Sequence, residues 1–151
     1  MFVKGKYNTD AVALDKRIES HDKFGSKDLN QWIFKNMQLH NGLSVLDLGS
    51  GTGKQSIPIA KTVGEGGSGC SVDLSQEALD SLMEKAYFNG VNNRITTLCC
   101  SHDDVQLSLD DNQFDRVVSS YSLYYTNDAE RMISSIWDKL KTGGILFYCG
   151  P

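Results

Sequence analysis

The chain has 151 residues, 40% of them hydrophobic and only two of them proline, so it is long enough to bury the core of one compact domain. Its formal net charge is -4, and no run of Lys or Arg is long enough to neutralise a stretch of phosphates. No apolar stretch approaches the roughly 20 residues that a membrane helix needs, and the N-terminus lacks the apolar region of a secretory signal. We therefore expect a cytoplasmic protein that binds neither nucleic acid nor membranes.

The cysteines do not predict a metal site. Cys70, Cys99, Cys100 and Cys149 form no Cys-x-x-Cys pair of the kind that zinc and redox sites use. Three of them lie in or beside apolar runs, as small buried residues do in a reducing compartment. We expect unpaired thiols and no bound metal.

The first predicted elements are a helix, a strand, a glycine turn and a second helix. The first helix is predicted by apolar residues at helical spacing, which are Leu29, Trp32, Ile33 and Met37. Its candidate N-caps are Ser26 and Asp28. Residues 45–48 form a short apolar run that breaks into the glycine-rich segment 49–53. The second helix follows at a spacing of three until Gly64 stops the pattern: Ile57, Ala60 and Val63.

The next unit repeats this order. Residues 69–73 predict a strand, Ser75 is a candidate N-cap, and Asn89-Gly90 ends the helix. One face of that helix is apolar: Ala78, Leu79, Leu82, Met83 and Ala86. A third strand is predicted over residues 95–99.

The last third of the chain predicts two strands around a helix. A strand over residues 114–121 follows the acidic stretch 101–113, and Gly143-Gly144 turns into a fifth strand over residues 145–149. The helix between them has a wide apolar stripe: Ala129, Met132, Ile133, Ile136, Trp137 and Leu140.

This alternation predicts the fold class. Strands that alternate with helices through short loops indicate a mostly parallel sheet of about five strands with helices on both faces, because each right-handed crossover must cover the sheet. We expect a single α/β domain over residues 1–151, doubly wound and Rossmann-like, with residues 1–25 as an N-terminal extension or lid.

The glycine turn indicates the kind of ligand. A turn between a first strand and its helix brings backbone N–H groups and the helix N-terminus against a bound nucleotide. The spacing Gly49-x-Gly51-x-Gly53 differs from the Gly-x-Gly-x-x-Gly dinucleotide turn, whose third glycine would fall at Lys54. Asp47 at the strand end attracts a cationic amine better than a diphosphate. A ligand with an amino group is therefore favoured.

Four motifs carry a family resemblance. Residues 45–53, Val-Leu-Asp-Leu-Gly-Ser-Gly-Thr-Gly, resemble the first motif of class I S-adenosylmethionine-dependent methyltransferases. Residues 72–75 resemble the second motif, and residues 103–115 resemble the stretch from the adenine-contacting acid to the fourth strand. Residues 140–144 resemble the Leu-Lys-Pro-Gly-Gly turn, with threonine in place of proline. The motifs stand in family order from about residue 29 onward, which is more specific than any one of them.

The resemblance implies S-adenosylmethionine as cofactor and gives roles to the first matched residues. Asp47 and the three glycines would hold its methionine end. Asp73 would accept hydrogen bonds from both ribose hydroxyls, and Leu74 would pack on the adenine face.

The later motifs supply the remaining contacts. Asp103 would accept from the adenine amino group while the backbone of Asp104 meets a ring nitrogen. Ser119, Ser120 and Tyr121 would line the cleft after the fourth strand. The expected cofactor-binding residues are Asp47, Gly49, Ser50, Gly51, Gly53, Asp73, Leu74, Asp103, Asp104 and Ser120.

Several of these residues have ordinary structural alternatives. Asp47 can be a turn former, and Asp73 can help Ser75 cap a helix. Asp103 and Asp104 can be solvated surface. The aromatic group Tyr121, Tyr124 and Tyr125 suits packing as well as an acceptor site. Tyr7 resembles a tyrosine that caps the cofactor in some relatives. The histidines, His21, His40 and His102, are more often surface or capping residues than bases, and only His102 lies near the expected cleft.

The reaction implied is methyl transfer to an acceptor that is a small molecule, with oxygen, nitrogen, carbon and sulfur all open. No residue is assigned as catalytic; for a hydroxyl acceptor, His102 or Asp103 is the nearest candidate base. The alternatives are an NAD(P)-dependent Rossmann oxidoreductase, which the glycine spacing and the lack of a Tyr-x-x-x-Lys pair disfavour, and a non-catalytic S-adenosylmethionine-binding fragment.

The strand count carries a further expectation. Full members of the family have two more strands after the fifth, so we expect strands six and seven to be absent here and the fifth strand to be an open edge. Such a truncated core is expected to bind the cofactor, to transfer methyl groups weakly or not at all, and to self-associate through residues 145–149.

Overall fold

The computed structural model describes residues 28–123 and 126–150 together with the single positions 12, 16 and 19. The strands are β1 (Ser44–Leu48), β2 (Ser68–Asp73), β3 (Ile95–Cys99), β4 (Phe114–Ser120) and β5 (Leu140–Cys149). The α-helices are α2 (Leu29–Asn36), α3 (Ser56–Val63), α4 (Gln76–Phe88), α5 (Val105–Ser108) and α6 (Ala129–Lys139), with 3-10 turns η1 (Asn92–Arg94) and η2 (His102–Asp104). The candidates Tyr7, His21, Ser26, Tyr124 and Tyr125 lie outside the described residues.

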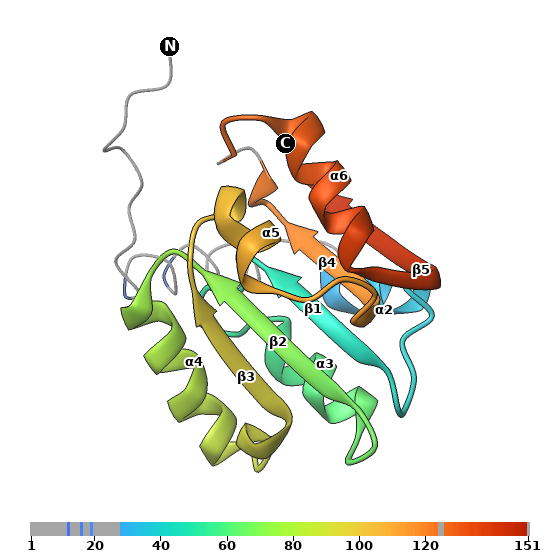
Figure 1. Cartoon of the computed structure of the whole chain (residues 1–151). Helices are drawn as coiled ribbons and strands as arrows, with labels where there is room; N and C mark the ends of the chain where they lie inside the picture. Colours follow the sequence, from blue (N-terminus) through green and yellow to red (C-terminus); the bar gives the residue numbers. More distant parts are fainter. Residues whose placement is uncertain (1–11, 13–15, 17–18, 20–27, 124–125, 151) are drawn as a thin grey trace.

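All five strands are parallel and stand in the order β3-β2-β1-β4-β5 (Figure 1). The chain moves outward from β1 to β3 and then returns to the other side of β1 for β4 and β5. Leu48 pairs with Val72 on one side and with Ser119 on the other, so β1, β2 and β4 end at one level. In an open α/β sheet a ligand binds beyond the carboxyl ends of the strands at this reversal. The predicted fold class is confirmed.

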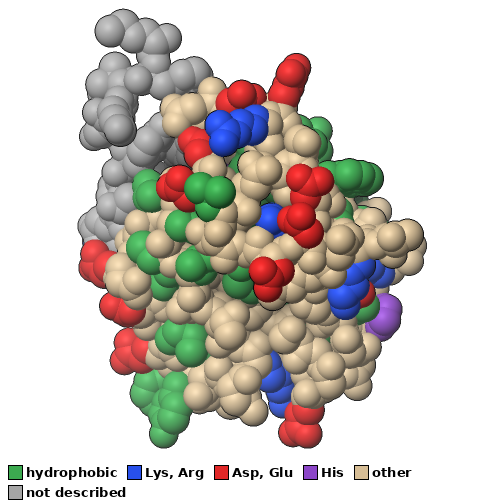
Figure 2. All heavy atoms as spheres, in the orientation of Figure 1, with side chains coloured by type: hydrophobic (Ala, Val, Ile, Leu, Met, Phe, Trp, Pro, Cys, Tyr) green, Lys and Arg blue, Asp and Glu red, His purple; other side chains and the backbone are tan. Residues whose placement is uncertain are grey.

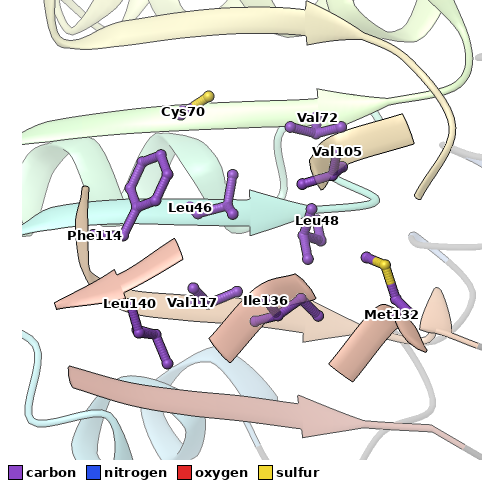
Figure 3. Close-up of a cluster of buried hydrophobic side chains, with 10 residues drawn as sticks. All are labelled: Leu46, Leu48, Cys70, Val72, Val105, Phe114, Val117, Met132, Ile136 and Leu140. Atoms are coloured by element: carbon purple, nitrogen blue, oxygen red, sulfur yellow. The ribbon is translucent and has the colours of Figure 1, made fainter. Parts of the chain in front are cut away.

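Helices cover both faces of the sheet. Figure 3 shows the cluster in which α5 and α6 pack on β1, β2 and β4, made of Leu46, Leu48, Cys70, Val72, Val105, Phe114, Val117, Met132, Ile136 and Leu140. A second cluster places α2 and α3 on the opposite face, made of Ile33, Met37, Leu43, Val45, Ile59, Val63 and Val118. The side chains of β1 alternate between the two clusters, as the two-residue period of a strand requires.

The helix starts follow the predicted capping chemistry. Asp28, one of two candidates, caps α2 by accepting from the Gln31 amide, and Ser75 caps α4 by accepting from the Ala78 amide. None of the described helices is long and apolar enough to cross a membrane.

Helix α2 is tied to β4 by a buried arginine. Arg116 Nε donates to the carbonyl of Met37, just past the end of α2, at 2.5 Å, and only 8% of Arg116 is exposed. The last four carbonyls of a helix lack hydrogen-bond partners within the helix. Arg116 is the donor for the carbonyl of Met37. This bond holds the end of α2 beside Arg116 of β4.

One prediction for the last third of the chain needs correction. Strand β5 begins at Leu140 instead of residue 145, because Leu140 pairs with Phe114 before an irregularity that resumes with Ile145 opposite Arg116. The stripe of α6 is only half covered, since Met132 and Ile136 are buried while Ile133 and Trp137 are 40% and 63% exposed. Periodicity predicts an apolar stripe without saying what lies against it.

The acidic stretch 101–113 is more ordered than its sequence suggests. It contains η2 and the short helix α5. The buried Lys139 fastens it to α6, because Nζ donates to the carbonyls of Gln106 and Leu109 and to the carboxylate of Asp111. A buried ammonium group is stable only when its donors are satisfied in this way.

Candidate functional site

The glycine turn after β1 needs its glycines. Gly49, Gly51 and Gly53 have positive φ angles of 73°, 53° and 93°, which residues with a Cβ rarely adopt. A Cβ on Gly49 would overlap the side chain of Ser122, and one on Gly53 would come within 2.8 Å of Leu82. The turn therefore lies tightly against the β4 loop on one side and α4 on the other.

Asp73 holds the turn to the end of β2. The Gly51 amide donates to Asp73 Oδ2 at 2.8 Å, and the Ser75 amide donates to Oδ1 at 2.9 Å. The amides of Gly49 and Ser50 donate to the carbonyl of Val72. Asp73 thus serves the start of α4 and also borders the turn. Each of its oxygens keeps a further lone pair with which to accept from a ligand.

Asp47 lies beneath the turn and is 4% exposed. Ser56, the first residue of α3, donates to its Oδ2 at 2.5 Å, and Ser71 donates to Ser56 at 2.8 Å. Burial raises the pKa of Asp47 to about 7; the Ser56 hydrogen bond opposes this rise and the charge of Asp73 adds to it. The carboxyl of Asp47 therefore titrates near neutral pH, where a nearby cation would favour its ionised form.

Ser119, Ser122 and His102 form a buried network where β1 and β4 end. Ser122 Oγ donates to the carbonyl of Leu48 at 2.8 Å, lies 2.7 Å from Ser119 Oγ and lies 3.1 Å from His102 Nε2. A hydroxyl has one proton, so after donating to Leu48 it must accept from the other two groups. His102 therefore carries a proton on Nε2. Since burial lowers the pKa of His102 against the opposing charges of Asp73 and Asp103, the neutral ring leaves Nδ1 as its basic nitrogen.

Asp103 and Asp104 lie on the exposed loop after β3. Asp103 accepts from Thr126 Oγ1 at 2.5 Å and from Asn127 Nδ2 at 2.7 Å, which joins this loop to the one after β4. The Thr126 hydrogen bond contributes most to a lowered pKa of Asp103, so the carboxylate is ionised at neutral pH. The amide of Asp104 donates to the carbonyl of Ser101 at 3.1 Å. Binding adenine through that amide would require the Ser101 bond to open.

The remaining predicted residues differ in exposure. Leu74 is 53% exposed just past the end of β2, as a residue that covers a flat ring would be. Ser50 Oγ and Ser120 Oγ are buried and have no hydrogen-bond partner in the described structure. Such orphaned hydroxyls are rare in native proteins, because burying a polar group without a hydrogen bond costs free energy. A ligand that supplies a donor or an acceptor removes that penalty. The two serines therefore fit a polar ligand at the turn.

The sequence did not single out Ser122, whose role depends on its contact with Gly49 across 73 residues of chain. Among the described residues, no group of three His, Cys, Asp or Glu side chains is placed to hold a metal ion.

Comparison with known proteins assigns the family. A model described as a methyltransferase domain matches residues 45–144, which span the glycine turn, Asp73 and the His102 network. The chain belongs to the class I methyltransferase family. It is 34% identical over 112 residues to 2-methyl-6-phytyl-1,4-hydroquinone methyltransferase 1 of Oryza sativa subsp. japonica, covering 74% of this chain and 32% of that relative.

One further relative and one solved structure resemble most of the chain. A phosphoethanolamine N-methyltransferase of Triticum aestivum is 28% identical over 142 residues, covering 92% of this chain and 26% of the relative. A solved structure of a SAM-dependent methyltransferase from Aquifex aeolicus superposes with a TM-score of 0.78 at 21% identity, covering 92% of this chain and 71% of that one. The chain thus spans about a third or less of the length of these two plant relatives.

Proposed function

We propose that this methyltransferase chain binds S-adenosylmethionine where β1, β2 and β4 end, and that it is the cofactor-binding core of an enzyme acting on a small molecule. The proposal rests chiefly on the 2.8 Å bond between the Gly51 amide and Asp73, which sets a carboxylate with spare lone pairs against the glycine turn. A carboxylate there can accept from two adjacent hydroxyls of a ribose. The orphaned hydroxyls of Ser50 and Ser120 add polar groups for the rest of the ligand.

The assigned roles follow the layout of the turn. Asp73 accepts from the ribose, Leu74 covers the adenine, and Gly49, Gly51 and Gly53 let the backbone approach the methionine end. Asp47 is too buried for broad contact, so it contributes mainly its charge. Asp103 accepts from the adenine amino group beside its bonds to Thr126 and Asn127.

The bound cofactor supplies an electrophilic methyl group on a sulfonium. The task left to the protein is to align an acceptor lone pair behind that methyl and to exclude water. For a hydroxyl acceptor, His102 is the better base of the two candidates, because its ring is neutral and its Nε2 is already committed to Ser122. Its Nδ1 can then take the proton.

A small-molecule acceptor is supported by two of the relatives, which are a hydroquinone methyltransferase and a phosphoethanolamine N-methyltransferase. On the face drawn in Figure 2, Lys and Arg side chains are scattered among Asp and Glu instead of forming one basic stripe. This distribution gives little support to a nucleic-acid partner. The four free cysteines suit a reducing, cytoplasmic compartment.

The open side of β5 supports self-association. Within the described residues, β5 pairs with β4 alone, and Tyr148 on it is 60% exposed. An uncovered strand edge is a template for pairing with another chain.

The reaction is tested with S-adenosylmethionine carrying a labelled methyl group. The purified chain is incubated with separate pools of small hydroquinones, alkyl amines and thiols, and label is followed into the extracted products. Slow label transfer to one class of acceptor that is lost in His102→Gln or Asp73→Ala supports a small-molecule methyltransferase. Binding of the cofactor with no transfer to any pool supports the non-catalytic alternative.

A further inference from the structure

Three of the four orphaned buried side-chain atoms in the described structure belong to residues around the glycine turn. They are Asn30 Oδ1, Ser50 Oγ and Ser120 Oγ, whereas the fourth, Arg94 Nε, belongs to a residue whose guanidinium bonds to Ala60 in α3. Ser50 and Ser120 come from segments that the motifs point to. Asn30 comes from α2, a helix to which no site residue was assigned.

The register of α2 along β4 brings Asn30 to the site. Met37 at the end of α2 lies at Arg116, and Ile33 one turn earlier packs in the same cluster as Val118. Asn30 is nearly one further turn toward the start of α2, and Ser120 is two residues further along the same face of β4. A helical turn rises about 5.4 Å and two strand residues about 6.6 Å, so the two elements stay in step. Asn30 therefore reaches the carboxyl end of β4 on the face of Ser120.

The orientation of the Asn30 amide is fixed by its neighbour. Asn30 Nδ2 donates to the carbonyl of Lys54, directly after Gly53, at 3.0 Å. A carbonyl can only accept, so the nitrogen must point to Lys54 and the oxygen must point away from it. Asn30 Oδ1 is then a buried acceptor that lacks a donor. A ligand group that supplies an N–H or O–H would satisfy it.

The strand order selects which part of the cofactor meets Asn30. Asp73 at the end of β2 takes the ribose in the proposed function, and β4 lies on the other side of β1 from β2. The cofactor end that lies away from the ribose and adenine is the amino-acid end. Its ammonium group has three N–H donors and no acceptor, which matches an orphaned carbonyl oxygen.

We propose that Asn30 is a specificity-determining residue of the cofactor site, because its Oδ1 accepts a hydrogen bond from the α-ammonium group of the bound cofactor. The inference rests on the proposed function and deepens it. It makes α2 a wall of the cofactor site and predicts that the chain prefers adenosyl ligands with an amino group. If Asn30 only ties α2 to the turn through Nδ2, this preference will not depend on Asn30.

The test compares two ligands by calorimetry: S-adenosylhomocysteine and its deaminated analogue, which differ only at the amino group. In Asn30→Ala, affinity for S-adenosylhomocysteine should fall about tenfold or more, the size of one hydrogen bond to a charged group. Affinity for the deaminated analogue should be unchanged. Asn36→Ala, which removes a side chain of the same kind from the exposed end of α2, should leave both affinities as they are.

Asn30→Asp provides the second variant, because it keeps an oxygen acceptor and removes the Nδ2 donor to Lys54. It should keep the preference for the amino-bearing ligand. An equal loss for both ligands in Asn30→Ala and Asn30→Asp would overturn the proposal and leave Asn30 a structural tie. Unchanged binding in Asn30→Ala would also overturn it. If the parent chain does not bind S-adenosylhomocysteine, the proposed function itself fails.

Discussion

His102 Nε2 lies 3.1 Å from Ser122 Oγ, and this bond joins the loops that follow β3 and β4 directly beside Gly49. Ser122 donates its single hydroxyl proton to the carbonyl of Leu48, so it must accept from His102. The His102–Ser122 bond therefore also fixes which nitrogen of His102 is protonated. The same serine fills the space that a Cβ on Gly49 would need. Ser122 thus couples the shape of the turn to the protonation of the nearest candidate base.

Removing the Ser122 hydroxyl should remove the hydrogen bond that fixes the tautomer of the His102 ring. In the parent chain, nitrogen-15 NMR should show a neutral His102 protonated on Nε2 alone. In Ser122→Ala a mixture of the two tautomers is expected, with a loss of about 1 to 2 kcal/mol in the free energy of unfolding from the broken hydrogen bonds. Ser134→Ala on the exposed surface of α6 is the control. An Nδ1-protonated ring in the parent chain would contradict the assignment.

Asp47→Asn should change how stability depends on pH. The pKa of Asp47 is about 7 in the folded chain against 3.8 ordinarily, so the folded state holds a proton that the unfolded state loses between these values. The stability linked to that proton is complete below about pH 4 and is lost as the pH rises toward 7. Asn carries no charge, so Asp47→Asn should gain thermal stability over the parent as the pH rises from 5 to 8.

The Asp47 comparison is made by thermal unfolding at several pH values. Asp80→Asn on the exposed surface of α4 is the matched control. A difference between Asp47→Asn and the parent that stays constant across this range would contradict the buried, raised pKa of Asp47.

Asp103→Ala should weaken recognition of the adenine amino group. The parent should bind the adenosyl ligand more tightly than its inosyl analogue, and the variant should narrow that difference by about 1.5 kcal/mol. Loss of the hydrogen bonds to Thr126 and Asn127 can loosen the loop, but a looser loop would lower the affinity for both ligands equally. Asp80→Ala on the exposed surface of α4 serves as the control. If the variant discriminates between the adenosyl and inosyl ligands as well as the parent does, Asp103 only links the two loops and does not recognise adenine.

Self-association is expected to depend on β5. Sedimentation should show reversible dimers of the parent chain as its concentration rises. Tyr148→Lys places a charge on the exposed edge strand and should shift the chain to monomers. Tyr87→Lys changes an aromatic residue of α4 that is 68% exposed and lies across the sheet from β5, so it should leave the dimer intact (Figure 1). A parent chain that stays monomeric at high concentration would refute edge pairing.

The sequence was most informative where short-range chemistry decides the structure. The glycines of the turn, the cap at Ser75 and the position of Asp73 at the end of β2 follow from local spacing, and the structure has them as expected. The parallel sheet with helices on both faces follows from the alternation of strands and helices.

Features that depend on distant partners could not be found in this way. Ser122 matters because it fills the space beside Gly49, and Asn30 matters because Arg116 sets the register of α2. The exposure of Trp137 depends on what covers α6, which no periodicity encodes. Strand β5 starts early because Leu140 pairs with Phe114. The sequence did not predict this pairing, because Gly143-Gly144 indicates a turn between Leu140 and the rest of the strand.

The central claim is that the glycine turn and Asp73 bind an adenosyl amino acid. It is tested most directly by titrating the chain in a calorimeter with S-adenosylhomocysteine, NAD and NADP, and repeating the first titration with Asp73→Ala and the surface control Asp80→Ala. Binding of S-adenosylhomocysteine alone is predicted, weakened by about 1.5 to 3 kcal/mol in Asp73→Ala and unchanged in Asp80→Ala. Binding of either dinucleotide in its place, or equal affinity in Asp73→Ala and the parent, would contradict the account.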